Sequence, residues 1–210
     1  MNYIANLHSA IEELVVRFQR NPYDFLYESD LQSMLFSLLE RRFADEKIAM
    51  TGGYWPSADY GGRETIYIIP VKSEYPLDGG PGRGQRFDIA LIDPSTVRNY
   101  DPEIWPSAGL KNDAFWTQPV LAAVELKYLQ LGEDRRQRRR GCDDDVGKLC
   151  RYLSWRGHNT FLGLSILFIQ SQSVDARFAF DDDWVPRSGQ PTSGLARYII
   201  SPSEFLKFSV

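Results

Sequence analysis

The sequence predicts an α/β fold in which a central mixed sheet is flanked by helices. Apolar runs of the length and composition of buried strands occupy 86–93, 120–128 and 161–169. Apolar residues at helical spacing precede the first run and also separate the last two. Strands and helices in this order typically form one sheet covered by helices.

The composition sets the broad class of the protein. A chain of 210 residues with 43% hydrophobic and 25% charged residues is ordinary for a globular protein with a sizeable core. We expect one domain (1–210), in which an N-terminal helix (1–20) precedes a core (21–170) and a C-terminal elaboration (171–210). No apolar run reaches the length of a membrane span, and the first eight residues do not resemble a secretory signal. We therefore expect a cytoplasmic protein with no membrane partner.

Charge and cysteine content narrow the possible partners. The net charge of −4 excludes a globally basic nucleic-acid coat, so a nucleic-acid site would need a local positive field. Cys142 and Cys150 lack the spacing of a zinc site, are expected on or beside one helix, and suit a reducing compartment.

Two helices are predicted before the first strand. The first ends near Arg20 and has a packing role, because its apolar residues recur at helical spacing. The second begins either at Asn21-Pro22, as N-cap and first helical residue, or at the capping box Ser29-x-x-Gln32. With the earlier start, Glu28 lies on the apolar stripe and faces the sheet. Glu28 then either joins a functional site or only complements the helix dipole.

Glycine, proline and serine mark the connections that follow. Residues 51–63 are expected to be a loop, and the β-branched run 64–71 a strand. The glycine-rich stretch 77–85 is expected to be a hairpin connection, because it lacks the ending of a phosphate loop and precedes a strand. Aromatic residues of the irregular insert 94–119 either anchor that insert or stack on unpaired bases.

Charged residues inside two of the apolar runs are the strongest functional feature. Glu125 and Lys127 lie two residues apart near the end of the run 120–128, so their side chains project from the same face of a strand. Asp88 lies within the run 86–93. Charges in core-like strands are costly unless they are paired or bind a ligand. The alternative is an exposed charge pattern on an edge strand.

Asp88 followed by Glu125-x-Lys127, on two strands preceded by a helix, resembles the PD-(D/E)XK nuclease superfamily. Phe87 stands where the family name has a proline, which the loose pattern of the family permits. The resemblance covers residues 28–170 and implies a restriction endonuclease-like core with the order αβββαβ.

The resemblance also implies roles for individual residues. In this superfamily the Asp and Glu carboxylates hold Mg²⁺, and the Lys positions or activates the attacking water. The implied metal ligands are Asp88, Glu125 and the carbonyl of Leu126, with Mn²⁺ as a possible substitute ion. Glu28 would hold a ligand water or a second ion, and Lys127 would act on the water.

Basic residues follow the Lys127 strand. Five of the six residues 135–140 are arginine, and they either grip phosphates beside the site or form a solvated loop. Asp143-Asp-Asp145 is expected to open a helix that ends at Gly157. In the resembled family this helix lends the site a basic or polar residue, and Lys148 is the candidate, the alternative being a surface lysine. The candidate nucleic-acid-binding residues are Arg135, Arg136, Arg138, Arg139, Arg140 and Lys148.

The C-terminal part carries little functional information. Residues 197–200 are expected to form a short final strand. The acidic triplet Asp181–Asp183 is interpreted as surface, because consecutive residues do not converge on one ion without a dedicated loop.

These features together predict Mg²⁺-dependent hydrolysis of phosphodiester bonds in nucleic acid, with DNA as the expected substrate, in restriction, repair or mobile-element biology. The only histidines, His8 and His158, lie far from the motifs, which argues against HNH, zinc and Ser-His-Asp chemistry. The alternatives are a non-cleaving nucleic-acid-binding protein that keeps the fold, or a structural or regulatory partner, which the acidic charge favours. A homodimer or a larger complex is compatible with each.

Overall fold

The computed structural model describes residues 2–51, 65–76, 86–94, 120–130, 135–156, 161–170 and 194–209. The elements in chain order are α1 (Tyr3–Arg20), the 3-10 helix η1 (Pro22–Asp24), α2 (Glu28–Arg42), β1 (Ile48–Thr51), β2 (Thr65–Ile68), β3 (Val71–Pro76), β4 (Arg86–Ile92), β5 (Val120–Leu129), α4 (Arg135–Arg156), β6 (Leu162–Ile169), β7 (Leu195–Ile200) and β8 (Phe205–Ser209). None of the helices in these ranges is long and apolar enough to span a membrane.

The central feature is a six-stranded mixed sheet with the order β3-β4-β5-β6-β7-β8. Strands β3, β4 and β5 pair antiparallel, β5, β6 and β7 pair parallel, and β8 pairs antiparallel with β7. Helix α4 connects the parallel strands β5 and β6, as a crossover requires. The predicted α/β class with a mixed, helix-flanked sheet is therefore confirmed.

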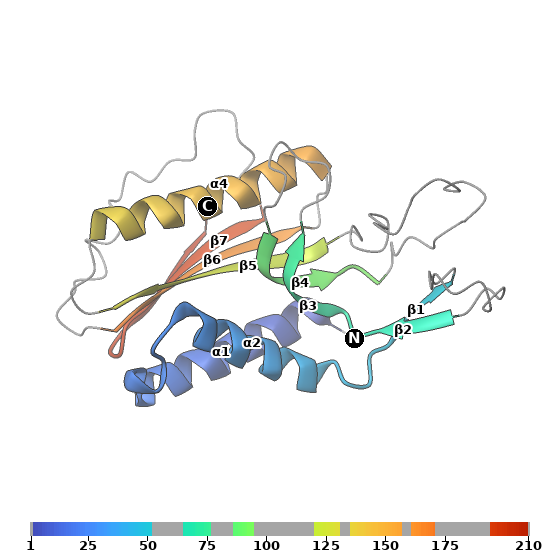
Figure 1. Cartoon of the computed structure of the whole chain (residues 1–210), viewed down its shortest axis with the longest axis horizontal. Coiled ribbons are helices and arrows are strands. Elements are labelled where there is room, and N and C mark those ends of the chain that lie inside the picture. Colours follow the sequence, from blue (N-terminus) through green and yellow to red (C-terminus); the bar gives the residue numbers. More distant parts are fainter. Residues whose placement is uncertain are drawn as a thin grey trace, which may run out of the picture.

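Helices cover both faces of this sheet. Helices α1 and α2 lie on one face and α4 on the other, while the β1-β2 pair projects beyond the end of the sheet (Figure 1). Alternate residues of β5 separate the two layers: Val124 and Leu126 belong to the core under α1 and α2, whereas Ala123 packs in the core that includes Leu149 of α4. By this alternation Glu125 and Lys127 lie on the same face, as the sequence predicts, and that face is the one covered by α4.

The N-terminal helices are organised by capping. The Asn2 side chain accepts a hydrogen bond from the N–H of Ala5 (3.0 Å), which starts α1. Helix α2 begins at Glu28, where neither predicted start places it, because Asp30 accepts hydrogen bonds from the N–H groups of Leu26 and Tyr27 (2.8 and 2.9 Å). Glu28 is therefore the first residue of α2.

Three predicted strand boundaries were wrong. The predicted strand 64–71 is two strands, β2 and β3, interrupted at Pro70, which has no N–H to donate to a ladder. Strand β2 pairs instead with β1, so that residue 51 is the last of a strand rather than loop. The strand at 195–200 is not the last, because β8 follows it and extends the sheet.

Helix α4 also begins earlier than predicted, at Arg135 rather than at Asp143–Asp145. The backbone of residues 135–140 is therefore helical, so the alternative of a loop there is wrong. The buried positions predicted for this helix are confirmed, and Cys142 and Cys150 both lie on it as free, buried thiols. The predictions for 52–64, 77–85, 95–119 and 181–183 fall outside the described residues.

Candidate active site

The candidate site lies where β4 and β5 separate. The recorded register between these strands runs up to the pair Ile89–Val124 and stops there. Asp88 directly precedes Ile89 on β4, and its carboxylate accepts a hydrogen bond from the N–H of Leu126 (2.7 Å). A side-chain oxygen thus serves as the acceptor that a paired strand would provide, which fixes the Asp88 carboxylate beside β5.

The backbone at Asp88 is held from α2. Gln32 donates hydrogen bonds to the Asp88 carbonyl (3.0 Å) and to Oε1 of Glu74 (2.9 Å). The pair Glu74–Asp88 is missing from an otherwise continuous β3–β4 register, and Glu74 has a φ of 49°, in the left-handed region. Both strands are therefore locally distorted where Asp88 lies, and the two hydrogen bonds from Gln32 stabilise this distorted backbone.

Glu125 is the most deeply buried carboxylate of the site, with 1% exposure. Its Oε2 lies 2.6 Å from Nζ of Lys148 on α4, whereas its Oε1 has no hydrogen bond within the described ranges. Burial, together with repulsion from Asp88, raises the pKa of Glu125 to about 9 even though Lys148 opposes the shift. The free protein thus keeps Glu125 protonated or paired with Lys148.

Lys127 joins both helical layers. Its Nζ lies 3.0 Å from Oε1 of Glu28 on α2 and 3.1 Å from Oδ2 of Asp145 on α4, and it also donates to the Leu126 carbonyl (3.1 Å). Burial lowers the pKa of Lys127, but attraction from Asp145 and Glu28 outweighs burial, so the pKa lies above its ordinary value. Lys127 therefore remains an ammonium at any physiological pH.

The pKa of Asp88 is raised to about 6, mainly by burial. The hydrogen bond from Leu126 and the charge of Lys127 lower it, and Glu28 raises it again. Asp88 is therefore ionised over most of the neutral range, although less completely than an exposed aspartate.

The structure brings most of the predicted site residues together. Glu28, Asp88, Glu125, the Leu126 carbonyl, Lys127 and Lys148 all belong to one network of contacts. Sequence analysis missed Asp145, which pairs with both lysines. Its spacing to Lys148, three residues on one helix, was an available signal. The side chains of Arg135, Arg136, Arg138, Arg139 and Arg140 lie outside the described part of the structure.

The donor set fits a hard divalent cation. Four carboxylates (Glu28, Asp88, Glu125 and Asp145) face two ammonium groups, which leaves a net charge of −2 when all are ionised. The buried Oε1 of Glu125 and the Leu126 carbonyl add oxygen donors of the kind that Mg²⁺ prefers. As the side chains stand, no three acidic, His or Cys residues in the described ranges are grouped to hold a metal ion. Lys127 and Lys148 are paired with three of the carboxylates.

No protein-family model, curated protein or solved structure matches this chain. Its function is therefore argued from the site itself.

Proposed function

We propose that the chain is a Mg²⁺-dependent nuclease with a restriction endonuclease-like core, which hydrolyses phosphodiester bonds in DNA. The observation that carries the proposal is the meeting of Asp88, Glu125 and Lys127 beside Glu28, at the point where β4 and β5 separate. The order of elements supports the same proposal: once the separate β1-β2 pair is set aside, α2, β3, β4, β5, α4 and β6 follow the order αβββαβ expected for such a core.

Asp88, Glu125 and the Leu126 carbonyl would hold the cation. A bound Mg²⁺, or Mn²⁺ in its place, makes a ligand water more acidic and neutralises charge on the phosphate. Lys127, fixed between Glu28 and Asp145, would orient the attacking water or stabilise charge that develops on the phosphate oxygens. Lys148 would contact a phosphate oxygen, and residues 135–140 on the first turns of α4 would contact the strand further along.

A second candidate is a nucleic-acid-binding protein that does not cleave. The observation in its favour is the Lys148–Glu125 pair at 2.6 Å, which neutralises the most buried carboxylate without a metal ion. The two candidates differ in one respect: only the nuclease binds Mg²⁺ and turns over.

The decisive experiment is cleavage of supercoiled plasmid, linear duplex, single strands and branched DNA with Mg²⁺ or Mn²⁺. We expect metal-dependent cutting by the wild type and by Glu12→Gln, which changes an exposed carboxylate of α1 that pairs with Lys207 on β8. Glu125→Gln and Lys127→Ala should abolish cutting. If the protein binds DNA but does not cut it, and calorimetry detects no heat of Mg²⁺ binding, the nuclease proposal is rejected in favour of the non-cleaving nucleic-acid-binding protein.

A further inference from the structure

The segment Pro22–Tyr27, which leads into the candidate site, exposes unusually large apolar side chains. Tyr23, Leu26 and Tyr27 are 65%, 59% and 64% exposed, and they are three of the six large hydrophobic residues found exposed in the described ranges. These three side chains lie within five consecutive positions, and exposed apolar residues grouped in this way typically mark an interaction site.

The backbone beneath these side chains is fixed. Asp30 binds the N–H groups of Leu26 and Tyr27, the Tyr128 hydroxyl donates to the Phe25 carbonyl (2.7 Å), and Gln130 donates to the Leu26 carbonyl. The exposed rings are therefore not carried by a loose loop. They are presented by a segment bonded to both α2 and the end of β5, and a surface ordered before binding loses less entropy when a ligand docks.

The segment adjoins the site at two points. First, Tyr27 directly precedes Glu28, whose carboxylate pairs with Lys127 (3.0 Å). Second, Gln130, which donates to the Leu26 carbonyl, directly follows the end of β5 and is three residues beyond Lys127. The segment is therefore joined to the candidate site through Glu28 and through the residue that follows β5.

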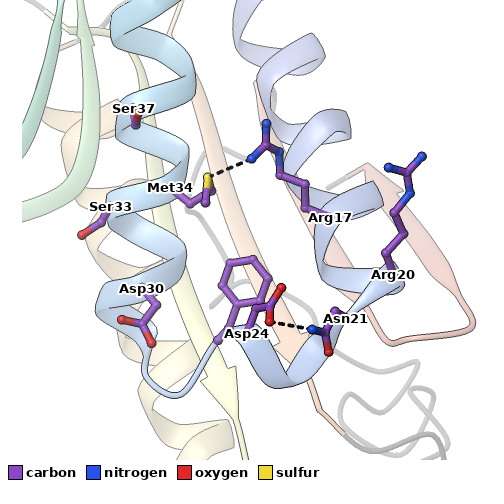
Figure 2. Close-up of a pocket in the computed structure, with 9 residues that line it drawn as sticks. Arg17, Arg20, Asn21, Asp24, Asp30, Ser33, Met34 and Ser37 are labelled. Carbon is purple, nitrogen blue, oxygen red and sulfur yellow. Dashed lines mark hydrogen bonds between the residues drawn. The ribbon is translucent and has the colours of Figure 1, made fainter.

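One exposed cation, Arg20, lies at the end of α1 just before the segment. Figure 2 shows the hollow of about 530 Å³ next to the segment, with Arg17 and Arg20 projecting from the end of α1. Asp24 and Asp30 also line this hollow and keep their negative charge; Asp24 accepts a hydrogen bond from Asn21 (2.5 Å), and Asp30 caps α2. Arg17 pairs with Glu13, whereas Arg20 has no ion pair or hydrogen bond in the described part of the chain and is exposed. Arg20 is thus available to a phosphate.

We propose that Tyr23, Leu26 and Tyr27 form a stacking surface for the bases of an unpaired strand, with Arg20 on its backbone. Exposed aromatic rings stack on base faces, and only an unpaired strand offers those faces, because a duplex keeps them inside its own stack. The inference rests on the proposed nuclease function and adds its substrate class: single-stranded DNA, or the unpaired part of a junction or flap.

The test compares binding with cleavage. Fluorescence anisotropy in EDTA would measure the affinity of a labelled oligo(dT) and of a hairpin duplex for the wild type, Tyr23→Ala/Tyr27→Ala and Tyr67→Ala. Tyr67 is the matched control, since it is also 65% exposed but lies on β2, beyond the far end of α2 (Figure 1). Thermal denaturation would establish that each variant is folded.

We expect the double variant to lose at least about tenfold in oligo(dT) affinity, since one stacked ring contributes about fivefold to about 150-fold. Its duplex affinity should stay within about twofold of wild type, Tyr67→Ala should bind like wild type, and Tyr23→Phe/Tyr27→Phe should retain oligo(dT) binding because the rings remain. Equal affinities for the double variant and Tyr67→Ala, an equal loss on duplex, or a loss in the Phe variant as large as in the Ala variant would each overturn the stacking surface.

The two proposals fail in different ways. A wild type that cleaves duplex DNA but does not bind oligo(dT) would overturn the stacking surface and leave the nuclease intact. A wild type that binds oligo(dT) through Tyr23 and Tyr27 but cleaves nothing with Mg²⁺ or Mn²⁺ would overturn the nuclease, and the stacking surface would belong to a binding protein.

Discussion

Glu125 makes the stability of the metal-free protein depend on pH. Burial raises its pKa from 4.5 to about 9, so the native state holds a proton that the unfolded chain releases. Burial likewise raises the pKa of Asp88 from its ordinary 3.8 to about 6, so between these pH values the native state also holds more of this proton than the unfolded chain. Because the native state binds more protons in these windows, stability is greatest below them and falls as pH rises. We expect the Tm in EDTA to fall from pH 6 to pH 9, and to fall less in Glu125→Gln.

Two comparisons separate this effect from general titration. Lys127 adds no slope in this window, because its pKa is raised from 10.5 and it is protonated in both states below that pH. Glu12→Gln, at an exposed ion pair, should show the wild-type decline. The same decline in Glu125→Gln as in the wild type would mean that Glu125 is ionised in the native state.

Residue chemistry was the part of the site most accessible from sequence. Asp88, Glu125 and Lys127 are conspicuous because charges interrupt apolar strands, and such charges need partners. Asp145 was overlooked because acidic residues near a helix start have a sufficient local explanation in the helix dipole. Only the crossover of α4 over β5 places it on Lys127, 18 residues earlier in the chain, at 3.1 Å.

At the scale of secondary structure, we expect Gln32 to affect cleavage by positioning Asp88 and not by taking part in the reaction itself. Gln32→Ala removes the hydrogen bonds to the Asp88 carbonyl and to Glu74 from the distorted β3–β4 pair. We expect a loss of about 1 kcal/mol in unfolding free energy and at least about a tenfold fall in cleavage rate, since small displacements of catalytic groups are costly. Urea denaturation and plasmid cleavage would measure the two effects.

Gln19→Ala is the matched control for Gln32→Ala. Gln19 also donates a part-buried side-chain hydrogen bond to a carbonyl, that of Ser201 (3.2 Å), but lies on α1 away from the site. We expect a similar loss of stability with unchanged cleavage. Equal cleavage rates in the two variants would show that Gln32 contributes only to stability.

Helix α4 offers a substitution that should stabilise the protein. Gly141 is helical, and a Cβ there would meet Cε and Cδ of Lys127 at 3.7 and 3.9 Å, which is ordinary contact. Gly141→Ala should therefore add about 0.5–1 kcal/mol of stability by reducing the entropy of the unfolded chain. Gly163→Ala should have the opposite sign, because its Cβ would lie 2.4 Å from Leu195. Denaturant midpoints of both variants would decide the matter.

The boundaries of elements were less predictable than their existence. The buried strands β4, β5 and β6 were found within one residue at each end, because apolar runs of that length have few alternatives. The start of α4 was misplaced by eight residues, since the arginines at 135–140 carry no apolar periodicity and Asp143–Asp145 resembles an N-terminus. In the observed helix Asp145 instead pairs with Lys127 on β5 and with Lys148 one turn away on α4.

At the scale of the whole molecule, the site depends on both helical layers at once. Lys127 is bonded to Glu28 from the layer of α1 and α2, and to Asp145 from α4 on the other face (Figure 1). This is possible only where β4 and β5 part and the sheet no longer separates the layers. The layers themselves could be predicted from apolar patterning, but their meeting at one lysine required the register of the strands.

The acidic charge of the molecule makes its salt response informative. With a net charge of −4, the proposed DNA binding requires local positive groups, and residues 135–140 supply the densest positive charge in the sequence. If Arg138 and Arg139 contact phosphates, Arg138→Gln/Arg139→Gln should lower affinity for a single strand. The slope of log affinity against log salt concentration should also become less steep, by about 0.7 per contact and thus about 1.4 in total.

Arg41→Gln/Lys47→Gln provides the control for this measurement. This double variant also removes two positive charges, but from exposed positions: Arg41 lies in the last turn of α2, and Lys47 follows the helix. Both are far along the chain from residues 135–140. Because a change in overall charge affects both variants alike, only the loss of phosphate contacts distinguishes them. Anisotropy titrations of oligo(dT) between about 50 and 200 mM salt would give both slopes. Equal slopes would mean that the arginines act through the overall field, and that the phosphates lie elsewhere on the molecule.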